Sequence, residues 1–319
     1  MNQHIDKASI CLTVSAEEDG MTARGALRRA RGISQRLVRK IVHGEGEGAG
    51  ALYINGKPAG FRDKVRTGDE IRLVFPEEES WIEPENIPID ILYEDDDILA
   101  INKQPGLVVH PTKGHREGTI AGAVIYHMRQ SGESYKPRFI SRLDMDTSGV
   151  LLIGKNSHAQ DSLAKQAASG GVGKYYMAVI EGRLEDDMPP RGIIDLPIGL
   201  ERQGEPRRAV LALEEGGYPS QTEYEVVAVE KDRQGETLTI VRVRLITGRT
   251  HQIRVHFSHL GHPVLGDHLY GRPTQLIARQ ALHATKISFE HPANGTGICI
   301  KAPIPQDMAV FASETEQYF

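Results

Sequence analysis

Cysteine and long apolar runs are scarce in this chain, and each shortage excludes a class of protein. The 319 residues include two cysteines, Cys11 and Cys299, which are too few for a disulfide scaffold or a thiolate zinc site. No apolar stretch approaches the roughly 18 residues of a transmembrane helix, so we expect no membrane-spanning segment. The first residues, 1–6, lack a basic start followed by an apolar stretch, which predicts a cytoplasmic protein.

The composition is that of a folded chain. Hydrophobic residues make up 39% and charged residues 25% of the sequence, which supplies enough apolar side chains for a core and argues against wholesale disorder. The length exceeds that of one typical domain. We therefore expect either one large domain or a small domain followed by a large one.

The charge is unevenly distributed along the chain. The net charge of −5 by itself argues against a nucleic-acid partner. However, residues 22–76 hold twelve Lys/Arg and five Asp/Glu, a net charge of +7, whereas residues 77–100 hold ten acidic side chains and no basic one. A phosphate backbone responds to local basic surface, so residues 22–76 are basic enough to contact RNA or DNA.

Residues 22–76 combine helical and hairpin signals. Thr22 is a suitable helix N-cap, and Gly32 shortly before Ser34 is typical of a helix–turn–helix break, so we expect one or two helices within residues 22–43. Asn55 and the glycine after it predict a tight turn, and the residues from 65 to 75 alternate like a strand. The expected result is a small α/β module with basic helices.

This block resembles the small RNA-binding module of ribosomal protein S-four. The resemblance is carried by residues 34–41, 53–57 and 65–71, with one departure, a glycine-rich lengthening at 44–50 that we interpret as a flexible linker. It implies an S-four-like RNA-binding domain over residues 9–76. The alternative, a basic helix face that is merely solvated, stays open. The side chains assigned to RNA binding are Arg28, Arg36, Arg39 and Lys40.

An acidic linker at residues 77–88, which contains two prolines, separates this block from a larger one at residues 89–319. The larger block intersperses strands and helices without regular alternation. This pattern predicts an α+β fold with a mixed, largely antiparallel sheet flanked by helices and loops. Strands are expected at 98–102, 150–153, 175–180, 222–229, 238–246 and 298–300, and helices at 121–128 and 157–168.

The strongest local signal for chemistry is the polar segment at residues 139–149, which directly precedes a buried strand. Loops at strand edges are where scaffolds display reactive side chains. Asp144 and Asp146 lie in this segment beside Arg142. Composition alone does not distinguish a reactive site from a structural turn capped by Asp146.

A family resemblance decides between these interpretations. The sequence Arg142-Leu143-Asp144, followed by residues 147–152, is similar to the catalytic motif of RluA-type pseudouridine synthases. Ser141 departs from the pattern, because many relatives have histidine there, and we expect it to modulate RNA contacts without removing the reaction. The resemblance covers residues 89–319. Further motifs follow in the family's order at 102–111, 174–178, 245–256, 261–271, 282–284 and 291–292.

The resemblance implies an isomerase that converts uridine in structured RNA, commonly large-subunit ribosomal RNA, to pseudouridine. The reaction breaks the bond between uracil and ribose, turns the base and rejoins it through carbon, so neither a cofactor nor a metal is needed. Asp144 is the expected catalytic carboxylate, because cleavage places positive charge on the anomeric carbon of the ribose. Three routes stay open for Asp144: attack on the sugar, attack on the base, or removal of a ribose proton.

Two further catalytic side chains follow from the same resemblance. Arg254, expected in a strand segment at residues 252–255, lowers the pKa of Asp144 and holds its orientation. Tyr176 stacks on the uracil and donates or accepts a proton when the reattached carbon loses its hydrogen.

The resemblance also implies a substrate-binding set. A uridine inside structured RNA must be flipped out to be reached, and Arg142 would fill the vacated stack or bind a neighbouring phosphate. A structural salt bridge from Arg142 to Asp146 is the alternative. Leu282 would pack on the other face of the base. Arg249 and His251 complete the set.

Other functions remain compatible with the residues. Five histidines lie between His251 and His268, but their spacing places them on different faces of the expected elements, so we favour structural or RNA-contacting roles over a metal site. A carboxylate-dependent nucleoside hydrolase would use Asp144 with Asp146 as the acid. A non-catalytic RNA-binding ribosome-assembly factor would not need Asp144. We expect a monomer whose partner is ribosomal RNA, with transfer RNA as the other substrate considered.

Overall fold

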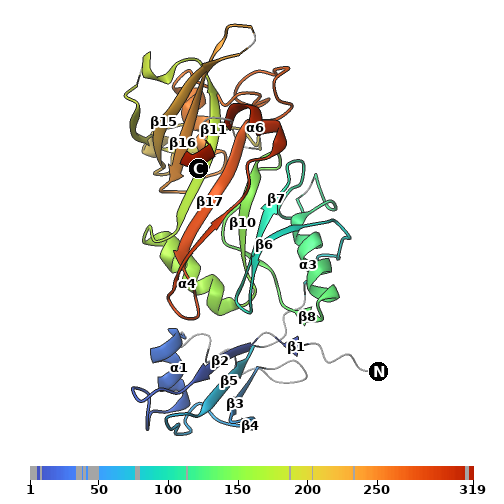
Figure 1. The fold of residues 1–319 in the computed structure, drawn as a ribbon, viewed down its shortest axis with the longest axis vertical. Helices are drawn as coiled ribbons and strands as arrows, with labels where there is room; N and C mark the ends of the chain where they lie inside the picture. Colours follow the sequence, from blue (N-terminus) through green and yellow to red (C-terminus); the bar gives the residue numbers. More distant parts are fainter. Residues whose placement is uncertain are drawn as a thin grey trace.

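Two main sheets organise the chain, a small one near the N-terminus and a large one that follows it (Figure 1). The computed structural model describes residues 6–7, 9–33, 38, 41, 50–75, 80–112, 114–186, 188–202, 204–232, 234–312 and 316–319. Within these residues, no helix is both long enough and apolar enough to cross a membrane.

The small sheet is antiparallel and packs against helix α1 (Ala23–Arg31). The helix has the predicted limits: the Thr22 hydroxyl accepts a hydrogen bond from the Gly25 N–H at 3.2 Å, and Gly32 ends it at φ 60°. Leu27 is fully buried against the sheet core. The strands run in the order β2 (Ser9–Thr13), β5 (Glu70–Val74), β3 (Ala51–Ile54) and β4 (Lys57–Pro58).

The second helix expected within residues 22–43 lies mostly outside the described residues. Val38 and Ile41 are described there, and both are helical and buried. Arg36, Arg39 and Lys40 lie outside the described residues, so their predicted RNA contacts stay predictions.

The large sheet is mixed and largely antiparallel, as the sequence predicts. Within the described residues, β10 and β17 form its parallel pair and the other pairings are antiparallel. The strand order is β12 (Arg191–Asp195), β15 (Gln221–Lys231), β16 (Thr237–Leu245), β11 (Gly173–Glu181), β17 (Leu282–Glu290), β10 (Ser148–Gly154), β7 (Ile98–Lys103) and β6 (Asp90–Glu94), with β18 (Gly297–Lys301) on β17 and β9 (Arg138–Phe139) on β10.

The parallel pair brings the 139–149 segment next to the start of β17. Gly149 pairs with Ala284 and has φ 112°, a conformation that favours glycine. A Cβ at this position would lie 2.2 Å from the Ala284 carbonyl oxygen, so only glycine permits this close approach of the two backbones. Leu282 consequently begins its strand beside the loop that carries Asp144.

Four helices of the larger block are α3 (Ile120–Gln130), α4 (Ser157–Ala168), α5 (Gln252–His259) and α6 (Gln306–Ala312). The expected helices at 121–128 and 157–168 are confirmed. The strand predicted at residues 252–255 is wrong, because these residues form the first turn of α5. Six consecutive side chains of α5, at 252–257, are buried. Because this helix has no solvent-exposed polar face along these residues, its sequence lacks the 3.6-residue hydrophobic period by which a helix is recognised.

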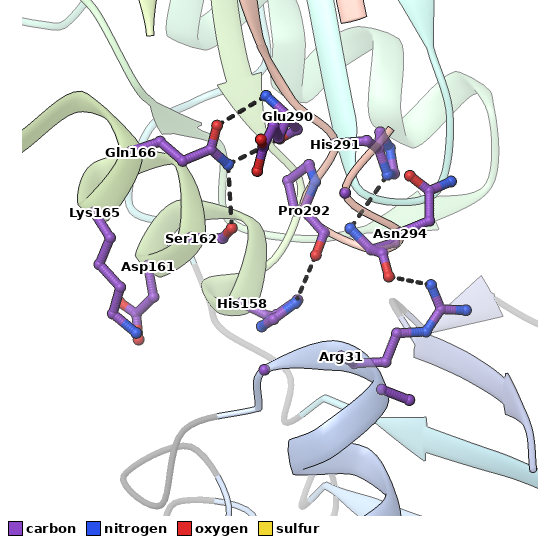
Figure 2. Close-up of a pocket in the computed structure, with 14 residues that line it drawn as sticks. Arg31, His158, Asp161, Ser162, Lys165, Gln166, Glu290, His291, Pro292 and Asn294 are labelled. Atoms are coloured by element: carbon purple, nitrogen blue, oxygen red, sulfur yellow. Dashed lines mark hydrogen bonds between the residues drawn. The ribbon is translucent and has the colours of Figure 1, made fainter. Parts of the chain in front are cut away.

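The N-terminal part of the chain contacts the larger block through strand β1 (Asp6–Lys7), which pairs outside the small sheet, and through helix α1. Strand β1 pairs in parallel with β8 (Glu133–Ser134). The Arg31 guanidinium at the end of α1 donates hydrogen bonds to the carbonyl oxygens of Ala293 and Cys11. This contact borders a cavity of about 450 Å³ between α1, α4 and the turn at residues 290–295. Figure 2 shows the side chains that line it.

Candidate active site

The loop that carries Asp144 is held by backbone hydrogen bonds. Lys103, fully buried at the end of β7, donates from its Nζ to the carbonyl oxygens of Met145 at 2.7 Å, Thr147 at 2.9 Å and Gln104 at 3.0 Å. Burial lowers the pKa of Lys103 to about 7, against the opposing effect of the nearby Asp146 and Asp144 carboxylates. The loop is therefore attached to the core of the sheet, and the position of the Asp144 backbone is fixed.

Arg254 lies between two carboxylates. Its Nη1 donates to Asp144 Oδ2 at 2.9 Å, while its Nε and Nη2 donate to the two oxygens of Asp267 at 2.6 and 2.8 Å. Asp267 is completely buried, and it also accepts hydrogen bonds from the backbone N–H groups of Leu269 and Tyr270. The contact expected between Asp144 and Arg254 is present, but Arg254 lies in helix α5 and not in the strand that the sequence predicts.

The pKa values of the buried pair favour its charged form. Burial alone raises the pKa of Asp267, yet the hydrogen bonds and positive charge of Arg254 outweigh it, and the pKa lies below its ordinary value. Burial likewise lowers the pKa of Arg254, but Asp267 and Asp144 raise it above the ordinary value. The guanidinium thus stays charged wherever the protein is folded.

A small cavity forms in front of the Asp144 carboxylate. Tyr176 of β11 and Leu282 of β17 line it from neighbouring strands, and Arg254 and His251 line it from α5 and the residue before that helix. Tyr176 is buried, and burial together with the nearby Asp144 raises the pKa of its phenol. The phenol is therefore neutral at physiological pH.

This inner cavity adjoins a larger one of about 510 Å³. Asp144, Tyr176, Arg142 and Arg249 line both. The outer cavity extends towards His110, whose ring meets Phe139 edge-on at 4.6 Å between centroids. Together the two cavities form a cleft whose narrow end holds the carboxylate–guanidinium pair.

The structure brings together the predicted side chains of the larger block. Arg142 lines both cavities and donates to the Thr250 hydroxyl at 3.3 Å; within the described residues it makes no ion pair with Asp146. The Nε of Arg249 donates to the Pro219 carbonyl oxygen at 3.3 Å. Thus neither cation facing the cleft has a carboxylate partner among the described residues.

His251 lies beside Asp144 in an unusual backbone conformation. Its φ is 57°, which is uncommon for a residue with a side chain. Its Nδ1 is 2.8 Å from the Tyr270 hydroxyl and its Nε2 is 3.9 Å from Asp144 Oδ1. Burial is the largest effect on the pKa of His251 and lowers it below its ordinary value; Arg254 and Arg208 lower it further, against the opposing effect of Asp144 and Asp267.

The loop before α5 is positioned by a side chain that sequence reasoning missed. Gln252 is buried, and its Oε1 accepts from the Arg249 N–H at 2.9 Å and from the Thr247 hydroxyl at 2.8 Å. Its Nε2 donates to the Gln221 carbonyl oxygen and to the Thr222 hydroxyl, both at 2.9 Å. These four bonds fix the loop that displays Arg249 and His251.

The histidines of this region have protein partners. His256 contacts Thr222 Oγ1 and the Leu196 carbonyl oxygen, and His262 contacts the Glu181 carbonyl oxygen. The His268 Nε2 lies 3.1 Å from the Ala278 carbonyl oxygen. In the part of the chain that the structure describes, no three His, Cys, Asp or Glu side chains form a group suited to a metal ion.

Comparisons with known proteins agree with this geometry. Residues 97–259 match the family described as RNA pseudouridylate synthase. An uncharacterized RNA pseudouridine synthase of Bacillus subtilis, YjbO, is 39% identical over 280 residues, which are 87% of this chain and 94% of the relative. Ribosomal large subunit pseudouridine synthase D of Vibrio parahaemolyticus is 37% identical over 84% of this chain and 85% of its own length.

The chain belongs to the RNA pseudouridylate synthase family. Among solved structures, human RNA pseudouridylate synthase domain containing 1 aligns with a TM-score of 0.54 at 27% identity, covering 72% of this chain and 89% of the human one. The α+β architecture is therefore that of a pseudouridine synthase. The protein is an enzyme that isomerises uridine in RNA.

In this pseudouridine synthase, two buried charges near Asp144 were not foreseen from the sequence. Asp267 lies in a segment that carries the family resemblance, at residues 261–271, yet its spacing from Arg254 gives no sign that the two side chains meet. Lys103 likewise lies within a resembling segment, at residues 102–111. In both cases the residue type and the motif were visible, but the partner depends on the tertiary fold.

Proposed function

We propose that this enzyme isomerises specific uridines of large-subunit ribosomal RNA, with Asp144 as its catalytic carboxylate. The observation that carries the proposal is the Asp144–Arg254 contact at the narrow end of a cleft lined by Tyr176, Leu282 and Arg142. The substrate is supported by relatives named ribosomal large subunit pseudouridine synthase D, from Vibrio parahaemolyticus and from Nitrosomonas europaea, the latter 36% identical over 81% of this chain.

The reaction rearranges one bond and one proton. The bond from uracil N1 to ribose C1′ breaks, a bond from uracil C5 to C1′ forms, C5 loses its proton and N1 gains one. Each of the three routes considered for Asp144 requires an ionised carboxylate close to the glycosidic bond, since a neutral acid neither attacks a carbon nor removes a proton. Arg254 supplies the adjacent positive charge, and Asp267 keeps it in place.

The inner cavity suits a uracil ring. Tyr176 offers an aromatic face for stacking, and Leu282 offers an apolar contact from the neighbouring strand. Arg142 stands at the wall shared by both cavities, where it would occupy the space that the flipped uridine leaves or contact a flanking phosphate. Arg249 and His251 would contact the rest of the nucleotide.

We further propose that residues 9–76 form an S-four-like RNA-binding domain, joined by the linker at 77–88 to a catalytic domain at 89–319. Arg28 supports this role, because it is exposed on α1 and has no carboxylate partner among the described residues. Arg36, Arg39 and Lys40 would extend the same basic surface. We expect the enzyme to act as a monomer in the cytoplasm, which size measurement in solution and fractionation would test.

The main test maps pseudouridines in ribosomal and transfer RNA from cells that lack the gene. Cells complemented with the wild type should regain one or more large-subunit sites, and cells complemented with Asp144→Asn should not. Asp146→Asn is the matched control, since this carboxylate lies in the same loop but lines neither cavity, and it should restore the sites.

Three outcomes separate the alternatives. Sites that vanish from transfer RNA alone would move the substrate away from ribosomal RNA. Restoration by Asp144→Asn would remove the carboxylate from the chemistry and leave an RNA-binding assembly factor. Release of free uracil from purified RNA would indicate a nucleoside hydrolase, whereas isomerisation leaves the RNA mass unchanged.

The RNA-binding domain is tested by salt dependence. Replacing Arg28, Arg36 and Arg39 together by Gln should weaken binding of ribosomal RNA and reduce the slope of log affinity against log salt concentration. Arg29→Gln is the control, because the Arg29 guanidinium is already paired with Glu17 at 2.7 Å. An unchanged slope in the triple variant would contradict the RNA role of this basic surface.

A further inference from the structure

Lys174 faces the cleft without a partner. It is the second residue of β11, two residues before Tyr176, and lines the outer cavity together with that tyrosine, while Tyr175 between them lies against Lys286. The described residues offer its ammonium no carboxylate and no hydrogen-bond acceptor. Burial lowers the pKa of Lys174, and no neighbouring anion opposes this effect. An unpaired lysine in such a place is costly to the folded protein, which argues for a ligand that supplies the missing negative charge.

The walls around Lys174 favour an anion. Arg142 and Arg249 line the same cavity and have no carboxylate partners among the described residues. The carboxylate in this lining, Asp144, is already paired with Arg254. Three cations therefore face the outer cavity with no free counter-charge, and the site suits a negatively charged group better than a neutral base.

The two cavities separate the base from its backbone. Lys174 lines the outer cavity and not the inner one, where Tyr176 and Leu282 lie. Asp144 lines both, so a ribose whose anomeric carbon is at Asp144 would extend from one cavity into the other. With the uracil in the inner cavity, the phosphates attached to that ribose would lie on the outer side.

Gly248 leaves the space that the ammonium occupies. A Cβ on this residue would lie 3.2 Å from Lys174 Nζ, so an alanine there would push the ammonium aside by a few tenths of an ångström. Gly248 also lines the outer cavity. The strand end of β11 and the loop after β16 thus cooperate to present a lysine head group to the cleft.

We propose that Lys174 binds a backbone phosphate next to the flipped uridine, in a subsite completed by Arg142 and Arg249. The proposal rests on the RNA substrate proposed above but not on which RNA is modified. It separates two tasks within one cleft: Tyr176 and Leu282 hold the base, and Lys174 fixes the backbone so that C1′ stays at Asp144.

Binding of a plain RNA probe gives the first test. An oligouridine of about 12 nucleotides is titrated with the full-length protein over a range of salt concentrations. Lys174→Gln should weaken binding about tenfold at low salt and reduce the salt slope by about 0.7, the value for one lost contact to a single-stranded phosphate. Lys174→Arg should keep most of the slope. Lys286→Gln, a lysine stacked on Tyr175 at 4.2 Å, is the matched control and should keep affinity and slope.

A second variant leaves the lysine itself unchanged. Gly248→Ala should weaken binding of the same probe by crowding the ammonium, and the double variant Lys174→Gln/Gly248→Ala should bind no worse than Lys174→Gln alone. Thermal unfolding of each variant shows that the protein remains folded. Additive losses in the double variant would mean that Gly248 acts on RNA independently of Lys174.

A neutral linkage then locates the phosphate. Probes carry a methylphosphonate at one linkage at a time around a single uridine. At one linkage next to that uridine, wild-type affinity should fall at least about tenfold, while the affinity of Lys174→Gln should fall by a smaller factor, because Arg142 and Arg249 still face that phosphate.

The proposal is overturned if Lys174→Gln keeps the wild-type affinity and slope, if Lys286→Gln loses as much, or if no linkage reduces the effect of the substitution. These binding results do not depend on pseudouridine mapping. If no ribosomal site is found in cells, the proposed function fails while the phosphate subsite is judged on the oligouridine alone.

Discussion

Arg254 gives two of its nitrogens to Asp267 and one to Asp144. The Asp267 contacts are at 2.6 and 2.8 Å and completely buried, whereas the Asp144 contact is at 2.9 Å at the edge of a cavity. The guanidinium is therefore fixed from behind by one carboxylate and presented to the other. This arrangement lets Asp144 approach a substrate while its hydrogen bond to the guanidinium is kept.

Replacing Asp267 should impair the reaction through Arg254. In Asp267→Asn the guanidinium loses its buried counter-charge, and we expect kcat to fall at least about a hundredfold with a smaller change in KM. We also expect the free energy of unfolding to fall by about 3–5 kcal/mol at neutral pH, because one partner of a buried pair is removed. Steady-state kinetics and denaturant unfolding measure the two effects.

The stability that Asp267 contributes should depend on pH in a definite direction. Since the pKa of Asp267 in the folded protein is below its ordinary value, the stability it contributes is present above the ordinary pKa, about 4, and is lost as the pH falls through the folded value. The variant and the wild type should therefore converge in strongly acidic solution. Asp307→Asn, which breaks a similar bidentate pair with Arg279 outside the cleft, should keep kcat within a few-fold.

Lys103 should be important for both stability and catalysis, although it lines neither cavity. Lys103→Met removes three hydrogen bonds to carbonyl oxygens, of which the Met145 carbonyl keeps the Gly106 N–H as a donor. The carbonyl oxygens of Thr147 and Gln104 lose the lysine donor, and each unpaired acceptor costs about 1–3 kcal/mol, so we expect the free energy of unfolding to fall by roughly 2–4 kcal/mol. Because Met145 and Thr147 flank the catalytic loop, kcat should fall as well. An active variant of wild-type stability would show that the loop holds its shape without the lysine.

The sequence identified local structure better than distant pairing. Thr22 and Gly32 delimit α1 as predicted, because caps depend on residues that are close along the chain. The register of the large sheet depends instead on residues that are distant along the chain, since Gly149 pairs with Ala284. No local signal reports that β10 and β17 run parallel.

In the candidate site, too, the sequence identified the motif residues but not their distant partners. Asp144, Tyr176 and Arg254 were recognisable because their motifs are short and contiguous, whereas the partner of Arg254 on its buried side, Asp267, follows α5 in a turn that only the fold brings back. Lys174 was visible as a motif residue, but its lack of a partner is a property of the folded cleft. Secondary structure failed at α5 because a helix buried on every side has no polar period.

Tyr176 is expected to serve both binding and chemistry, and two substitutions separate these roles. Tyr176→Phe keeps the ring that stacks on uracil, so RNA affinity should be unchanged, while kcat should fall about a hundredfold or more through loss of the hydroxyl proton. Tyr176→Leu should additionally weaken binding, because stacking contributes about 1–3 kcal/mol per base. Anisotropy titration and single-turnover kinetics provide both values. A Phe variant with wild-type kcat would restrict the tyrosine to stacking.

His283 should make the folded protein less stable in mild acid. It is fully buried beside Ser148, with 2.8 Å between its Nδ1 and the serine hydroxyl, and burial lowers its pKa to about 4. Below the ordinary value of 6.5 the unfolded chain binds a proton that the folded protein refuses, so the free energy of unfolding decreases as the pH falls from about 6.5 to about 4 and then levels off. The share of this one residue is at most about 3 kcal/mol.

His283→Asn isolates that share, because an amide keeps a polar atom near Ser148 but does not titrate. We expect the variant to be less stable than the wild type near pH 7.5 and to lose much less stability between about pH 6.5 and pH 4, as measured by urea unfolding at each pH. His259→Asn is the control, since His259 is exposed at the end of α5, and its unfolding curve should follow the wild type throughout. If His283→Asn keeps the full pH dependence of the wild type, the buried imidazole is not its source and the other buried histidines must account for it.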